Sequence, residues 1–264
     1  MTPAAIEDAA RRLARNRTER AALGQLPEAC RPPDEDAAYA VQDAMNSLFA
    51  ADEFGHIAGW KIGCTTPVMQ SYMGIDHPGA GAVLAPTIHA TPASLRHADY
   101  VAIGVEGEIA VRLSADLPAP HAPFDRASVG EAVGECMAAI ELVDARYADY
   151  RSLDTWTMVA DNFFNAGCVL APPVAGWRAL DLPSAAGVMT VNDAETGRGV
   201  GGNVMGHPFE SVAWLANTLA RRNKGLQAGE IVLTGSIVET QWLAAGDSMR
   251  FAVEGLGEVA ASFA

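Results

Sequence analysis

Apolar residues near the N-terminus recur at the spacing of a helix. They lie three or four positions apart after Asp34, at Ala38, Val41, Met45 and Leu48. This spacing places them on one helix face. Because Asp is a good N-cap and two prolines precede it, we expect the helix to begin at Asp34. The first sixty residues are predicted to be mainly helical.

Two further helices are predicted later in the chain. The pattern Ser128-Val129-Gly130-Glu131 resembles a capping box and is expected to open a helix that leads into a strand at 139–143. Another helix is expected after Pro208, ending at Gly225. Its inward face carries apolar residues at Val212, Leu215, Ala216 and Leu219.

The rest of the chain has the pattern of β-strands. Runs rich in β-branched residues predict strands at His56–Cys64, Tyr100–Leu113, Val188–Asn192, Glu230–Thr234, Met249–Val253 and around Val259. Helices do not separate these runs regularly, which argues against Rossmann and TIM-barrel folds and favours a rolled or barrel-like mixed sheet. We therefore predict an α+β fold, with a smaller helical part at residues 1–55 and a mixed-β domain at 56–264.

Charge and composition narrow the possible partners. The chain has 264 residues, of which 50% are hydrophobic, and 18 Lys and Arg against 32 Asp and Glu give a net charge of −14. This sign is wrong for binding nucleic acid or an anionic membrane. The sequence begins without the pattern of a signal peptide, has no apolar run long enough to span a membrane and contains no Cys-x-x-Cys motif. We expect a cytoplasmic protein with reduced cysteines.

Three glutamates are the strongest candidates for chemistry. Glu106 and Glu108 are two positions apart in a predicted strand, so their side chains point to the same side. By themselves they are equally consistent with a solvated pair on the surface. Glu141 favours a site because it lies in an apolar stretch, where an unpaired carboxylate is costly. Three partly buried carboxylates predict a hard cation, Mg²⁺ or Mn²⁺.

Lys61 is the candidate cationic group. It lies between Trp60 and Ile62 in a short segment bounded by glycines. One interpretation is an ordinary strand lysine whose stem reaches solvent. The other is a desolvated ammonium that binds an anionic substrate or transfers a proton, with a pKa that burial lowers.

Two polar segments offer further candidate ligands. Thr234 and Ser236 flank a glycine that permits close approach of a ligand, although an ordinary turn has the same pattern. Asp161 and Asn162, with Asn165, are consistent with ligand orientation or with an Asx turn.

Taken in order, these segments resemble the 2-keto-4-pentenoate hydratase and 4-oxalocrotonate decarboxylase family, within the fumarylacetoacetate hydrolase superfamily. The resemblance covers about residues 39–264. It rests on Gly59–Gly63, Met69-Gln70, Glu106-x-Glu108, Ala139–Arg146, Asp161-Asn162, Trp214–Asn217 and Gly229–Ser236.

The resemblance implies a fold, a reaction and a set of site residues. The fold is a β-roll-like C-terminal domain, and Glu106, Glu108 and Glu141 hold Mg²⁺ or Mn²⁺. The reaction adds water to a 2-hydroxy-2,4-dienoate and gives a 4-hydroxy-2-oxo acid, as in the catabolism of aromatic compounds. A homo-oligomer without nucleic-acid or membrane partners is expected. Lys61 is expected to be catalytic, and the substrate-binding residues are expected to be Gln70, Asp161, Asn162, Thr234 and Ser236.

One departure from the family pattern leaves the reaction open. Hydratases of the family carry an acid in a Pro-Asp-aromatic-Gly stretch, whereas this chain has Pro78-Gly79-Ala80-Gly81. Asp76 and His77 are the nearest replacements in the sequence. Decarboxylation of a 4-oxalocrotonate-type 2-oxo-enedioate, carbon–carbon hydrolysis of an acylpyruvate and a non-enzymatic metal-binding module therefore remain alternatives.

Overall fold

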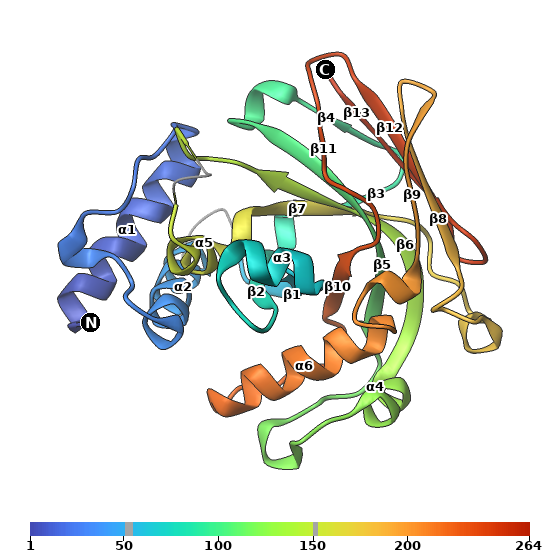
Figure 1. Ribbon diagram of the computed structural model, residues 1–264, viewed down its shortest axis with the longest axis horizontal. Helices are drawn as coiled ribbons and strands as arrows, with labels where there is room; N and C mark the ends of the chain where they lie inside the picture. Colours follow the sequence, from blue (N-terminus) through green and yellow to red (C-terminus); the bar gives the residue numbers. More distant parts are fainter. Residues whose placement is uncertain (51–54, 150–152) are drawn as a thin grey trace.

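The computed structural model describes residues 1–50, 55–149 and 153–264 (Figure 1). Within them, the strands form two mixed sheets. The larger sheet has the order β2 (Gly79–Leu84), β1 (Ile57–Gly63), β10 (Ile231–Ser236), β5 (Ile103–Leu113), β6 (Val133–Asp144), β7 (Asn165–Leu170) and β3 (Ile88–Ala90), with β11 (Gln241–Trp242) paired to β5. The smaller sheet has the order β4 (Ala93–Leu95), β13 (Gly257–Phe263), β12 (Ser248–Val253), β8 (Ala186–Val191) and β9 (Ala194–Val200).

The helices lie around these sheets. They are α1 (Pro3–Glu19), α2 (Glu35–Ala50), α3 (Pro67–Met73), α4 (Arg126–Ala132), α5 (Thr155–Ala160) and α6 (Pro208–Arg221). In Figure 1, α1 and α2 lie at one side of the molecule and the smaller sheet at the opposite side. The fold has the predicted α+β class, and neither sheet closes into a barrel within the described residues.

Most of the predicted strands form, with ends shifted by a few residues. Strands β2, β3, β4, β7, β9 and β11 were not predicted. β2 consists only of glycine and apolar residues and is buried throughout, so it lacks the alternation that marks a half-exposed strand. None of the helices described in the structure is both long enough and apolar enough to span a membrane.

Three details of the predicted helices need correction. Asp34 does cap α2, since its side chain accepts a hydrogen bond from Ala37 N at 2.9 Å. Leu48, however, lies at the exposed edge of α2, and Phe49 takes the buried position. Ser128 is the third residue of α4, which begins earlier because Asp125 and Ser128 form the capping box. Helix α6 ends at Arg221, before Gly225.

Side-chain hydrogen bonds connect the N-terminal helices to the larger sheet. Gln42 of α2 donates to the carbonyl oxygens of Ala80 at 2.9 Å and Val159 at 2.7 Å. Its burial among apolar residues makes these bonds costly to lose. The domain boundary at residues 55 and 56 stays a prediction, and residues 51–54 beside it lie outside the described part.

Candidate metal and substrate site

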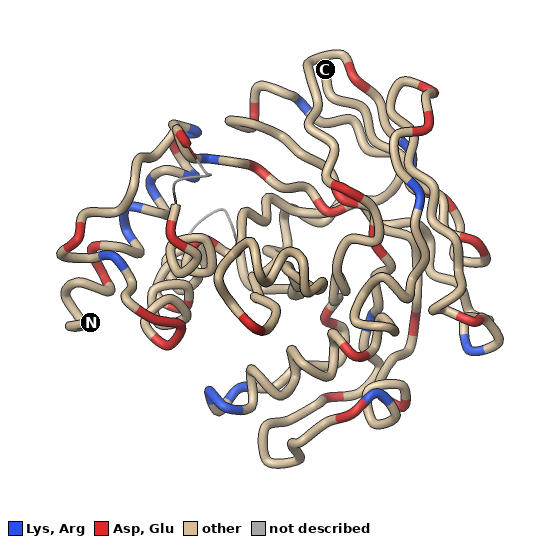
Figure 2. The backbone as a smooth tube through the Cα atoms, in the orientation of Figure 1, with Lys and Arg blue, Asp and Glu red and all other residues tan. Residues whose placement is uncertain are grey.

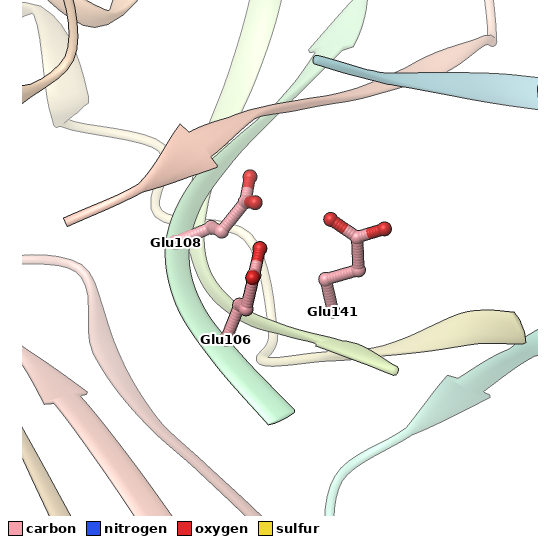
Figure 3. A group of neighbouring side chains, drawn as sticks. All are labelled: Glu106, Glu108 and Glu141. Carbon is pink, nitrogen blue, oxygen red and sulfur yellow. The ribbon is translucent and has the colours of Figure 1, made fainter. Parts of the chain in front are cut away.

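The β5–β6 ladder brings the three glutamates together. Glu106 lies directly opposite Glu141 in the antiparallel register, and Glu108 is two residues along the same face of β5. Figure 3 shows their carboxylates pointing into one space. One oxygen from each lies within 4.8 Å of the others. Glu108 and Glu141 are fully buried, which excludes a solvated pair on the surface.

A protein donor holds one oxygen of each glutamate. Gly235 N donates to Glu108 Oε2 at 2.7 Å, and Asn165 Nδ2 donates to Glu141 Oε1 at 2.9 Å. The hydroxyl of Thr240 donates to Glu106 Oε1. In contrast, Glu108 Oε1 and Glu141 Oε2 are buried without a hydrogen-bond partner among the described residues. Buried carboxylate oxygens without partners are costly, so these two are available to a cation.

The electrostatics also fit a cation. Burial and repulsion by Glu141 and Glu106 raise the pKa of Glu108 well above its ordinary value. Burial likewise raises the pKa of Glu141, although Lys61 opposes this shift. A divalent ion would relieve the repulsion, and an all-oxygen ligand set is the kind that Mg²⁺ and Mn²⁺ prefer. The three glutamates therefore form a candidate metal site.

Lys61 is part of the same cluster. Its Nζ lies 3.2 Å from Glu141 Oε1 and 5.1 Å from the centre of the Phe163 ring. The residue is 2% exposed, which excludes a stem that reaches solvent. Burial lowers the pKa of Lys61, but Glu141, Glu106 and Glu108 outweigh it and raise this pKa above its ordinary value. Burial thus lowers this pKa as expected, but in the metal-free protein the net shift is upward.

The end of β10 contributes through its backbone. Gly235, whose φ is +122°, presents the N–H that binds Glu108. The hydroxyl of Thr234 donates to Ile109 O at 2.7 Å, and that of Ser236 donates to Val238 O at 2.6 Å. Both hydroxyls thus have partners inside the protein, and their roles in substrate binding stay predictions.

Asp161 and Asn162 are fully buried. Asp161 Oδ2 accepts hydrogen bonds from Arg146 Nη2 at 3.0 Å and from Tyr147 OH at 3.2 Å. Asn162 exchanges hydrogen bonds with the side chain of Asn46 and accepts one from a backbone N–H of β2. These contacts hold the segment that carries Phe163, so the structure gives both residues internal partners.

The remaining predicted residues lie on α3 and on the segment that follows it. Gln70 Nε2 donates to Cys64 O at 3.0 Å. The side chain of Asp76 is 99% exposed. His77 Nε2 lies 3.5 Å from a carboxylate oxygen of Glu35 on α2, and its ring stacks on Trp214 of α6. These contacts are with α2 and α6, so the catalytic roles of Asp76 and His77 stay predictions.

Several contributing groups were not found from the sequence. Thr240 had no motif, and Phe163 had no signal beyond its place next to Asp161-Asn162. The N–H of Gly235 cannot be singled out by a side-chain pattern. The sequence pattern includes Asn165 as a polar candidate, but it does not indicate the hydrogen bond of Asn165 to Glu141.

Residues 77–264 match the family model described as fumarylacetoacetate (FAA) hydrolase C-terminal. This chain belongs to the fumarylacetoacetate hydrolase family. The matched segment holds all three glutamates, whereas Lys61 lies before it. The family assignment therefore agrees with the fold and with the carboxylate cluster, and confirms the resemblance seen in the sequence.

Relatives within the family match most of the chain or nearly all of it. A 2-keto-4-pentenoate hydratase of Paraburkholderia phymatum is 36% identical over 98% of this chain and 97% of its own length. A 2-hydroxyhexa-2,4-dienoate hydratase of Comamonas testosteroni is 34% identical over 78% of each chain. The solved structure of 4-oxalocrotonate decarboxylase from Pseudomonas putida G7, complexed with magnesium and adipate, matches 100% of this chain and 99% of its own, with a TM-score of 0.94 and 26% identity.

Proposed function

We propose that this protein is a divalent-metal-dependent hydratase that converts a 2-hydroxy-2,4-dienoate into a 4-hydroxy-2-oxo acid. The proposal is carried by the carboxylate cluster, in which two buried glutamate oxygens lack partners beside the ammonium of Lys61. The hydratase relatives at 34–36% identity support the same reaction class. The ligand chemistry favours Mg²⁺ or Mn²⁺.

The protein groups have distinct tasks in this reaction. Glu106, Glu108 and Glu141 would hold the ion, which supplies a Lewis acid to the carboxylate and 2-oxygen of the substrate. Lys61 Nζ donates toward the 2-oxygen and stabilises the negative charge that develops there when its proton leaves. A proton added at C5 gives the 2-oxo-3-enoate. Water then adds its OH at C4 and its H at C3, which completes the balance.

A 4-oxalocrotonate-type decarboxylase is the second candidate. It is supported by the match to the decarboxylase structure at a TM-score of 0.94. It is also supported by Gly79, where the family hydratases carry an acid, because loss of CO₂ requires no activated water.

One pair of assays separates the two reactions. The purified protein with Mg²⁺ is incubated with 2-hydroxypenta-2,4-dienoate and, separately, with a 2-oxo-enedioate, in D₂O. NMR identifies the products and CO₂ release is measured. We expect 4-hydroxy-2-oxopentanoate from the dienoate, with solvent deuterium at C3 and C5. Stoichiometric CO₂ from the enedioate without hydration of the dienoate would establish the decarboxylase instead.

The same assay tests the origin of the remaining proton transfer. If Asp76 or His77 replaces the missing acid, Asp76→Asn or His77→Gln slows hydration. If both variants retain normal rates, a group other than Asp76 and His77 transfers the proton of the water.

A further inference from the structure

One face of the β1–β2 ladder is almost devoid of side chains. Lys61 lies opposite Gly81, and Gly63 lies opposite Gly79. Residues paired in this way point to the same side, so this end of the face carries one lysine and three glycines. A Cβ on Gly81 would clash with the carbonyl of Asn162. The glycines therefore leave room for another segment to lie directly on the ladder.

That segment places a phenyl ring next to Lys61. A Cβ on Gly79 would lie 2.6 Å from Phe163 Cε2, and a Cβ on Gly63 would lie 2.9 Å from Phe163 Cδ1. The ring thus occupies the space above both glycines. It is 7% exposed, and its centre is 5.1 Å from Lys61 Nζ.

The backbone that carries the ring is unusual. Asn162, Phe163 and Phe164 all have positive φ, at 52°, 51° and 64°. Residues other than glycine rarely adopt this conformation, and each one costs free energy that the surroundings must supply. The side-chain hydrogen bonds of Asn162 to Asn46 and to Ala82 N hold the segment. Simple filling of the core does not require such a conformation.

The ammonium of Lys61 has three N–H groups to direct. Glu141 Oε1, at 3.2 Å, takes one side of it, and the ring attracts it on another. We propose that Phe163 is a positioning residue for Lys61. Its ring and Glu141 hold the ammonium between them, so that a remaining N–H is presented to the 2-oxygen of the substrate. This inference rests on the proposed 2-oxo acid chemistry.

A partial reaction tests the inference without hydration or decarboxylation. The compound 2-oxopentanoate has the 2-oxo acid group but no alkene to hydrate and no second carboxylate to lose as CO₂. Entry of solvent deuterium at its C3 is followed by NMR, with Mg²⁺-loaded full-length protein at saturating ligand. The affinities for Mn²⁺ and for 2-oxopentanoate are measured separately by titration.

The variants distinguish the effect of the aromatic ring of Phe163 on Lys61 from the effect of its apolar volume. Phe163→Leu retains apolar volume but loses the ring, and we expect exchange to slow by about tenfold while both affinities stay within about twofold. Phe163→Tyr retains the ring and should exchange near the wild-type rate. Phe164→Leu is the matched control, because Phe164 has the same backbone conformation and its ring packs on Tyr147. Phe163→Met replaces Phe163→Leu if the latter does not fold.

The outcomes are distinguishable. Wild-type exchange in Phe163→Leu or Phe163→Met would overturn the inference alone. Equal slowing in Phe163→Leu and Phe163→Tyr would overturn it as well, because the ring face would then not matter. No exchange in the wild-type protein would overturn the proposed 2-oxo acid chemistry and the inference together.

Discussion

Asn165 Nδ2 donates a hydrogen bond of 2.9 Å to Glu141 Oε1. The same oxygen lies 3.2 Å from Lys61 Nζ, whereas Glu141 Oε2 has no hydrogen-bond partner among the described residues. A residue outside the carboxylate cluster therefore determines which oxygen is available to a cation. Arg17 of α1 donates to the carbonyl of Asn165, so the first helix of the chain contacts this support.

Asn165→Ala should weaken metal binding. Without the amide, Glu141 is no longer held in one orientation, and the affinity for Mn²⁺ should fall roughly 10-fold or more. Titration followed by electron paramagnetic resonance measures this affinity. An affinity within about twofold of wild type in Asn165→Ala would contradict the assigned role.

Glu108→Gln should stabilise the metal-free protein at alkaline pH. Glu108 is fully buried, and its pKa in the folded state is raised, so the folded state binds more protons than the unfolded one. The free energy of unfolding of the wild-type protein therefore falls as pH rises from about 4.3, the ordinary pKa of Glu, through the raised pKa of Glu108. At pH 8 we expect the free energy of unfolding of the variant to be higher by ~1 kcal/mol or more. Its melting temperature should then be higher by roughly 2–4 °C.

The difference should vanish as pH falls below about 4.3, where Glu108 is protonated in both the folded and the unfolded state. Saturating Mg²⁺ should reverse the order, because only the wild-type protein gains binding energy. Glu135→Gln on β6 is the control, since the Glu135 side chain is 38% exposed and its carboxylate lies 3.3 Å from Arg112 Nη1. If metal-free Glu108→Gln had a lower melting temperature than wild type at pH 8, ionisation of Glu108 would not destabilise the folded protein.

Lys61→Met should separate turnover from metal binding. Methionine keeps much of the stem volume but removes the ammonium, so the rate should fall at least ~10²-fold. Mn²⁺ should bind no less tightly, because a positive charge beside Glu141 is removed. Steady-state kinetics and metal titration on one preparation check both. Turnover near the wild-type rate would show that Lys61 has a structural role and is not catalytic.

Gly79→Ala should destabilise the fold through Phe163. The new Cβ would lie 2.6 Å from Phe163 Cε2, and overpacking of this kind costs about 1–3 kcal/mol. In a Phe163→Ala background, the same change should cost less than ~0.5 kcal/mol, because the clash is gone. Gly176→Ala is the control, since no atom lies within 4 Å of its added Cβ and its φ is −91°. If Gly79→Ala lowered the free energy of unfolding equally in both backgrounds, its effect would not arise from contact with Phe163.

The sequence by itself determined the local features of the site. A period of two in a strand places Glu106 and Glu108 on one face whatever the rest of the chain does. The apolar neighbours of Glu141 predicted burial, which the structure confirms. For Lys61 they left burial and a solvent-reaching stem both open, and the structure shows burial. The net charge of −14 argues against nucleic acid or an anionic membrane as a partner, and this stays a prediction. Figure 2 shows acidic residues spread over the whole molecule. These features depend on neighbours in the chain, and such neighbours are visible in a sequence.

Only the tertiary structure decided how these groups meet. The register that sets Glu106 opposite Glu141 depends on pairing between strands, and the donors Asn165, Thr240 and Gly235 come from separate segments. Phe163 reaches Lys61 only because glycines on two paired strands leave space for a left-handed backbone. Such contacts depend on register and packing between segments distant in the sequence. Local propensity carries no information about either.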